Sequence, residues 1–148
     1  MQKFGPPFYK QETADSCLPA CLRMVLAERG WMMTEARLRK LCRCKPLMGT
    51  LSSDAVAAAI QLGFTDSEES QSLRLRDLRD VLREGIYPIV GVDLRHLRGF
   101  WAPHALVVVA VTSSFVRVHD PMDGRLRLVP SLFEAAWEDA DFVTILVL

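Results

Sequence analysis

The pattern of hydrophobic residues divides the chain into a helical first half and a strand-rich second half. After Ser16, apolar residues recur three and four positions apart, which is the stripe of a helix packed on a core (Leu18, Cys21, Leu22, Val25 and Leu26). Gly30 suits the C-terminal end of such a helix. The pattern therefore predicts a helix over 18–29, with Cys17 in its first turn.

Three further helices are predicted in the first half. Thr34 is placed to cap a short helix that runs to residue 41, and Ser53 to cap another that ends at Leu62 and Gly63. A fourth is predicted over 75–84, because its leucines and Val81 fall on one face. The Ser- and Glu-rich segment 66–72 is predicted to be an exposed loop.

The second half favours β-strands. Segments rich in Val, Ile and Leu are separated by turn residues such as Asp123 and Gly124, and the predicted strands cover 87–93, 104–112, 115–120, 125–129 and 142–148. One helix, over 131–138 after Pro130, interrupts them. Helices followed by an antiparallel sheet predict an α+β fold.

Size and composition indicate one globular domain over 1–148. Half of the 148 residues are hydrophobic and 24% are charged, which is typical of a chain that folds on its own. Eighteen basic residues balance eighteen acidic ones, so bulk charge does not favour nucleic acid as a partner. Residues 1–7 contain no apolar run of a signal peptide, and no stretch reaches the roughly twenty apolar residues of a membrane span. A cytoplasmic protein is therefore expected.

The four cysteines raise the question of a metal site. Cys17 and Cys21 stand four positions apart, and Cys42 and Cys44 two apart, which is not the paired spacing of a zinc knuckle. Cys21 also belongs to the apolar stripe of the first helix. No metal or other cofactor is therefore predicted. Basic residues around Cys42 and Cys44 can lower thiol pKa values, so a redox role for these two cysteines stays open.

Cys17 is a candidate nucleophile. A thiol in the first turn of a helix meets unpaired backbone N–H groups and the positive end of the helix dipole, and both favour the thiolate. The alternative is a buried structural cysteine, which is common. Six residues earlier, the side-chain amide of Gln11 could point with the Cys17 backbone N–H at one oxyanion. Without the cysteine, Gln11 would be interpreted as an ordinary solvated residue.

A cysteine nucleophile needs a base, and the candidates are His96, His104 and His119. His104 begins a very apolar strand directly after the rigid Pro103, which makes it the best-placed candidate base. The alternative is a structural histidine that is hydrogen-bonded to the backbone. Asp120 ends the next strand, where a tight hairpin would bring it near the imidazole to orient it. An Asp before Pro is also a common turn former. His119 should face the opposite side of the sheet from Asp120 and is therefore not included in the candidate site.

Three ordered motifs resemble the bacteriocin-processing peptidases, family thirty-nine of the cysteine peptidases in the papain-like group. They are the segment from Gln11 to Leu22, the segment from His104 to Val109, and His119-Asp120-Pro121 with Gly124. The resemblance covers nearly the whole chain and implies a papain-like fold. It also implies Cys17 as nucleophile, Gln11 as oxyanion-hole donor, His104 as general base and acid, and Asp120 as the residue that orients His104.

The resemblance further implies a peptide or protein substrate. Members usually remove a leader peptide after a double glycine and are commonly part of an exporting ABC transporter. Ser16 and Leu18 stand where the family usually has Asp and Gly, so the groove beside the nucleophile is expected to differ. A partner exporter, or a ubiquitin-like protein with a Gly-rich tail, is the partner expected. Acyl or peptidyl transfer, isopeptidase activity and non-catalytic peptide binding remain the alternatives to peptide hydrolysis.

Overall fold

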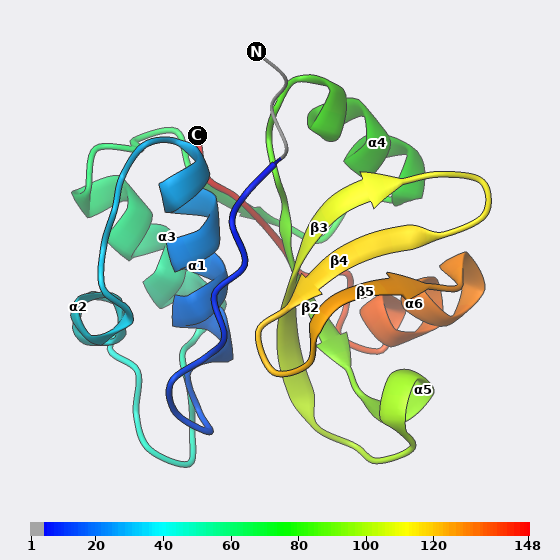
Figure 1. The fold of residues 1–148 in the computed structure, drawn as a ribbon, viewed down its shortest axis with the longest axis horizontal. Helices are drawn as coiled ribbons and strands as arrows, with labels where there is room; N and C mark the ends of the chain where they lie inside the picture. The colour runs from blue at the N-terminus through cyan, green and yellow to red at the C-terminus, as the bar shows by residue number, and fades with distance from the viewer. Residues whose placement is uncertain (1–4) are drawn as a thin grey trace.

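A six-stranded antiparallel sheet divides the computed structural model, and helices pack on both of its faces (Figure 1). The structure describes residues 5–148. The helices are α1 (Cys17–Glu28), α2 (Glu35–Leu41), α3 (Ser52–Gln61), α4 (Leu75–Arg83), α5 (Arg95–Arg98) and α6 (Pro130–Glu138). The strands are β1 (Glu68–Ser70), β2 (Ile89–Asp93), β3 (Pro103–Val111), β4 (Val116–Asp120), β5 (Gly124–Leu128) and β6 (Thr144–Leu146).

The sheet has the strand order β1-β6-β2-β3-β4-β5, and alternate residues of its central strands enter two different cores. Ala105 and Val107 of β3 pack with α1, α2 and α3. Leu106 and Val108 pack with α4 and α6. Burial on both faces explains why β3 is an almost unbroken apolar run, since neither side can carry solvated residues.

The structure confirms the α+β fold of helices followed by an antiparallel sheet. The predicted helices and strands are present, with ends that shift by a few residues. Thr34 caps α2 as predicted, because its side chain accepts a hydrogen bond from the backbone N–H of Arg37. Pro130 is the first residue of α6 rather than the residue before it, which suits proline because the first N–H of a helix has no partner within it.

Two predictions were wrong, and one element was missed. The segment 66–72 is not a plain loop: residues 68–70 form β1, which pairs with β6 at the edge of the sheet. Ser53 is not a cap, because α3 begins at Ser52 and Leu51 holds the cap position without a side-chain bond. The helix α5 had no sequence signal, since it is only one turn long and none of its residues is buried.

No helix within residues 5–148 combines the length and the apolar character that crossing a bilayer requires. The prediction that residues 1–7 lack a signal peptide falls partly on residues 1–4, which lie outside the described residues.

Candidate active site

Cys17 is the first residue of α1, where the chain leaves the N-terminal loop 11–16. As the first helical residue, it has a backbone N–H with no partner inside the helix. The thiol is half-buried, and Cys17 lines the same pocket as His104, close enough to raise the pKa of the imidazole. Packing of α1 on β3 in the core of Leu22 and Val107 fixes this end of the helix against the strand that carries His104.

His104 and Asp120 come together because β3 and β4 are neighbours in the sheet. Val107 pairs with His119, so the start of β3 lies beside the end of β4. The Nε2 atom of His104 lies 2.7 Å from Oδ1 of Asp120, and both side chains are only 3% exposed. The fold thus brings three candidate residues of the sequence analysis, Cys17, His104 and Asp120, to one end of the sheet.

The charges of this pair depend on one another. Burial by itself lowers the pKa of His104, but the hydrogen bonds with Asp120 and Cys17 outweigh it and raise that pKa to about 9. Burial works to raise the pKa of Asp120, yet the hydrogen bond and the charge of His104 hold it below its usual value. The backbone N–H of Met122 and the charge of Arg98 act in the same direction. An imidazolium beside a carboxylate is thus the favoured state near neutral pH.

Arg98 is the site residue that the sequence did not reveal. It ends α5, and its guanidinium lies 2.5 Å from Oδ2 of Asp120. The same group forms an ion pair with Asp123 and donates to the sulfur of Met122, in the turn between β4 and β5. Arginines are frequent in this chain, and no spacing distinguishes Arg98 from the others. Only the fold shows that it reaches the carboxylate.

Gln11 lies near the site, but its amide is occupied. Its Nε2 donates to the carbonyl oxygens of Thr13 at 2.8 Å and Ala14 at 3.3 Å, while its Oε1 is buried without a partner. The backbone N–H of Gln11 donates to the carbonyl of Pro121, next to Asp120. The segment is therefore anchored beside the triad candidates. In this arrangement, however, both amide hydrogens of Gln11 serve its own loop.

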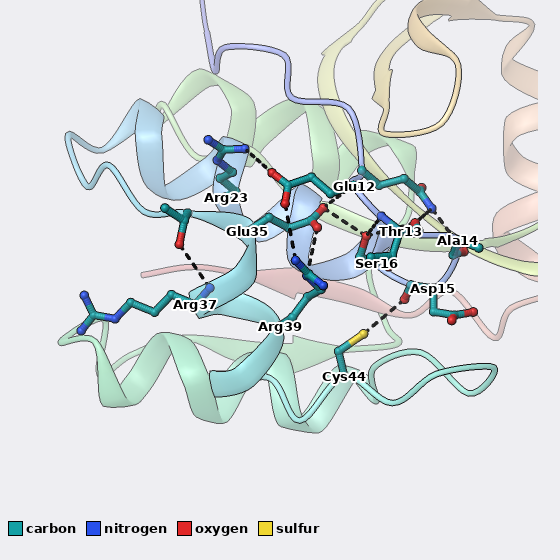
Figure 2. Close-up of polar contacts among 12 residues, drawn as sticks. Glu12, Thr13, Ala14, Asp15, Ser16, Arg23, Glu35, Arg37, Arg39 and Cys44 are labelled. Carbon is teal, nitrogen blue, oxygen red and sulfur yellow. Dashed lines mark hydrogen bonds and ion pairs between the residues drawn. The ribbon is translucent and has the colours of Figure 1, made fainter.

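A buried carboxylate holds the N-terminal loop in place (Figure 2). Glu35, at the start of α2, is fully buried, and its Oε1 accepts hydrogen bonds from the backbone N–H of Glu12 at 2.9 Å and from the Ser16 hydroxyl at 3.1 Å. Its other oxygen lies 3.1 Å from Nε of Arg39. Ser16 in turn accepts from the backbone N–H of Thr13. The residue directly before Cys17 is thus tied to α2.

Asp15 connects the same loop to a second one. Its carboxylate accepts a hydrogen bond from the backbone N–H of Leu47 at 2.9 Å. Its carbonyl accepts one from the Cys44 thiol at 3.4 Å, which Figure 2 shows. Lys45 and Gly49 exchange backbone hydrogen bonds across this second loop. Leu47 therefore projects into solvent from a fixed backbone, with 95% of its surface exposed, and lines the same pocket as Cys17.

A pocket of about 540 Å³ lies in front of Cys17 and His104. Exposed apolar side chains line this pocket, and they come from separate segments of the chain. Leu47, Met48 and Leu51 precede α3, whereas Phe100 follows α5 and Met122 follows β4. Leu18 lines the pocket directly beside Cys17. The lining is mostly apolar, which suits an extended peptide better than a charged metabolite.

The other candidate residues lie elsewhere. Cys21 and Cys42 are buried in the core with α1. Burial raises the pKa of the Cys21 thiol well above its usual value, and it raises the pKa of the Cys42 thiol to about 12. Within residues 5–148, no group of three or more His, Cys, Asp or Glu side chains is arranged to hold a metal ion. His119 faces away from His104 and packs edge-on against Phe8, as the alternation along β4 predicts.

Known structures resemble the chain over nearly its full length. The peptidase domain of Streptococcus ComA, a bi-functional ABC transporter involved in a quorum sensing pathway, matches with a TM-score of 0.76 and 25% identity, over 94% of this chain and 96% of that chain. A putative C39-like peptidase from Bacillus anthracis matches with a TM-score of 0.80 and 13% identity, over 96% and 94%.

A third structure has a bound peptide. It is a double glycine motif protease from an AMS/PCAT transporter in complex with the leader peptide, with a TM-score of 0.71 and 17% identity, over 96% of this chain and 92% of that chain. A comparison with curated proteins found no match. The model of the Peptidase C39 family matches residues 6–145, which is almost the whole chain. The chain is therefore a member of the Peptidase C39 family with a papain-like peptidase fold.

Proposed function

We propose that this family member is a cysteine peptidase that uses Cys17 as nucleophile, His104 as general base and acid, and Asp120 to orient His104. The observation that carries the proposal is that Cys17 and His104 line one apolar pocket while His104 is bonded to the buried carboxylate of Asp120. A nucleophile, a base and an orienting group in contact are what covalent acyl transfer requires.

The chemistry follows from these contacts. The Cys17 thiolate attacks the scissile carbonyl carbon, and the carbonyl π electrons move to its oxygen. As the oxyanion collapses, the C–N bond breaks and the His104 imidazolium gives its proton to the leaving amine. The product is a thioester on Cys17. Neutral His104 then takes a proton from water, which attacks the thioester and releases the acid and the thiolate.

The oxyanion is stabilised by the backbone N–H of Cys17 and by the side chain of Gln11. Gln11 must first exchange one of its bonds to Thr13 or Ala14, because both of its amide hydrogens are engaged. Substrate binding next to Ala14, which lines the pocket, gives a route for that exchange. Gln11 thus becomes a donor only when the peptide is bound.

The proposed substrate is a peptide with small residues, such as Gly-Gly, before the cleaved bond. We expect Leu18, which lines the pocket beside Cys17, to disfavour a bulky side chain next to the cleaved bond, and the exposed apolar side chains of the pocket to contact larger residues further from it. A similar protease binds a leader peptide, and a similar domain belongs to an ABC transporter. We therefore propose a peptide exporter as the partner of this chain.

The test is cleavage of peptides that carry Gly-Gly before a varied residue, followed by mass spectrometry. Cys17→Ala and His104→Ala should each abolish cleavage while thermal unfolding stays cooperative. Peptides with Leu-Leu in place of Gly-Gly should be poor substrates. Cleavage that survives in Cys17→Ala would refute the proposed nucleophile, and equal cleavage of the Leu-Leu peptides would refute the proposed specificity.

A further inference from the structure

The turn between β4 and β5 is tied to α5 by one side chain. Arg98 contacts Asp120 and Asp123 with its guanidinium and donates to the sulfur of Met122 at 3.2 Å. It is 18% exposed, so it is partly withdrawn from water. Gly124, with φ 99°, and the backbone hydrogen bond from Asp123 to Asp120 already close this turn. The turn therefore does not require a guanidinium in contact with two carboxylates to keep its shape.

The two oxygens of Asp120 have separate partners. Oδ1 accepts from Nε2 of His104 at 2.7 Å and from the backbone N–H groups of Met122 at 2.8 Å and Asp123 at 3.3 Å. The contact to Oδ2 comes from Arg98, at 2.5 Å. A carboxylate held at both oxygens cannot rotate about its last bond. The contact at Oδ2 therefore restrains the carboxylate plane in addition to the backbone donors at Oδ1.

We propose that Arg98 is a positioning residue of the active site, whose guanidinium fixes Oδ2 of Asp120 so that Oδ1 keeps the His104 ring in its working orientation. This inference rests on the proposed function, because it assigns Arg98 a part in the Cys17–His104–Asp120 reaction. Arg98 does not line the pocket, so it acts through Asp120 and not on the substrate.

The fold places Arg98 for this task. Asp93 ends β2 beside Pro103 of β3, and its carboxylate accepts a hydrogen bond from the backbone N–H of Arg95, which starts α5 at the open end of the β2–β3 pair. Gly99 then turns the chain back with φ 80°, a conformation that favours glycine. The last side chain of this single turn consequently points at the end of β4.

The charged and titratable groups around Asp120 come from several elements. They are His104 of β3, Arg98 of α5, Asp123 of the turn, and the thiols of Cys17 and Cys21 in α1. Arg98 is the permanent cation in this set, whereas the positive charge of His104 changes as that residue passes protons during the reaction. Without Arg98, Asp120 should hold a proton at higher pH and should lose its fixed plane.

The experiment compares Arg98→Gln and Arg98→Lys with Arg95→Gln. Arg95 is a matched control, because it is an arginine of the same helix that pairs with Asp93 and Asp139 but not with Asp120. For Arg98→Gln we expect kcat to fall about tenfold to a hundredfold, as for the loss of one charge-assisted hydrogen bond, with KM almost unchanged. The acid limb of kcat/KM should move to higher pH. Arg95→Gln should match the wild type.

Arg98→Lys keeps the charge but cannot hold two carboxylates with one planar group, so its kcat should lie between those of the wild type and Arg98→Gln. Wild-type kcat and an unshifted pH profile in Arg98→Gln would overturn the inference. If Arg98→Gln does not unfold cooperatively, Arg98→Lys decides instead, and wild-type kcat in that variant would overturn it. Activity in Cys17→Ala would refute the proposed function itself, whereas an inactive Cys17→Ala with a normal Arg98→Gln refutes only the role of Arg98.

Discussion

At the scale of single residues, the proposed mechanism depends on a histidine that keeps its proton. Burial in an apolar strand would normally make an imidazole neutral, but Asp120 and Cys17 reverse that tendency and set the pKa of His104 at about 9. A protonated His104 can deliver a proton to the leaving amine at neutral pH. The same residue must become neutral once the acyl-enzyme has formed, since it then takes a proton from water.

The pH dependence of cleavage follows from this value. The imidazolium form is present below pH 9 and is lost above it, so kcat/KM should fall on the alkaline side with a midpoint near pH 9. Asp120→Asn removes the partner that raises the pKa, so its alkaline limb should move to lower pH. Rate profiles and NMR titration of the His104 ring measure both effects. A wild-type His104 that titrates near 6.5 would contradict this explanation.

Gln11 gives a second prediction at this scale. If its amide stabilises the oxyanion, Gln11→Ala should lower kcat about 10²- to 10³-fold, as the loss of one such donor does elsewhere. The matched control is Gln61→Ala, since Gln61 is an exposed residue of α3 far from the pocket. Steady-state kinetics at one pH are sufficient. A fall of less than threefold would mean that the backbone N–H of Cys17 acts without Gln11.

At the scale of elements, α2 holds the catalytic loop through Glu35. This side chain is fully buried and receives hydrogen bonds from Glu12 and Ser16. Its removal would leave those donors unsatisfied inside the protein, which is costly. Ser16, directly before Cys17, is thereby bonded to a carboxylate from α2.

We expect Glu35→Ala to lower the free energy of unfolding by about 2–4 kcal/mol, because buried hydrogen bonds and the contact with Arg39 are lost together. Urea denaturation measures the loss. Glu134→Ala is the control, since Glu134 is an exposed glutamate of α6 and should change stability by less than about 0.5 kcal/mol. Equal unfolding midpoints for the two variants would show that Glu35 does not hold the loop.

The elements also show what a sequence can and cannot predict. Helix α1 and strand β3 are strongly periodic or strongly apolar, so their positions follow from the pattern alone. Strand β1 does not, because Glu68, Glu69 and Ser70 are polar and become a strand only through pairing with β6. In the same way, α5 exists because Asp93 and Gly99 shape one turn between β2 and β3, and a single turn leaves no repeat to detect.

At the scale of the whole molecule, two buried histidines oppose each other in how stability depends on pH. The pKa of His119 is lowered to about 4, by burial and by the charges of Arg125 and Arg117, so stability should fall as the pH drops from 6.5 toward 4. The pKa of His104 is raised, so its contribution is complete below pH 6.5 and is lost as the pH rises toward 9. The two effects together place maximal stability near neutral pH.

His119→Leu tests the acid side of this balance. The variant cannot take up the proton that destabilises the folded state, so its free energy of unfolding should decline less between pH 6.5 and 4 than that of the wild type. His96→Gln is the control, because His96 is largely exposed and pairs with Asp139 outside both cores. Urea unfolding at four or five pH values gives the slopes. Parallel slopes in the wild type and His119→Leu would contradict the assignment.

The arrangement of the site could be predicted only in part. Cys17, His104 and Asp120 carry chemistry that is recognisable in a sequence, and hairpin geometry brings the last two together. The role of Gln11 depends on the direction of an amide, which here points at the loop carbonyls. Arg98 and Glu35 could not be found, because an arginine or a glutamate becomes special only when the packing of separate elements brings it to the catalytic loop or strand.

The central claim is that Cys17 is activated by His104 to attack a peptide carbonyl. The most direct measurement is labelling with a peptidyl chloromethyl ketone that ends in glycine, in which the thiolate displaces chloride, followed by mass spectrometry of the digested protein. We predict one adduct, on Cys17, that is absent in Cys17→Ala and forms much more slowly in His104→Ala. Labelling of Cys44 in place of Cys17, or equal rates in the wild type and His104→Ala, would contradict the claim.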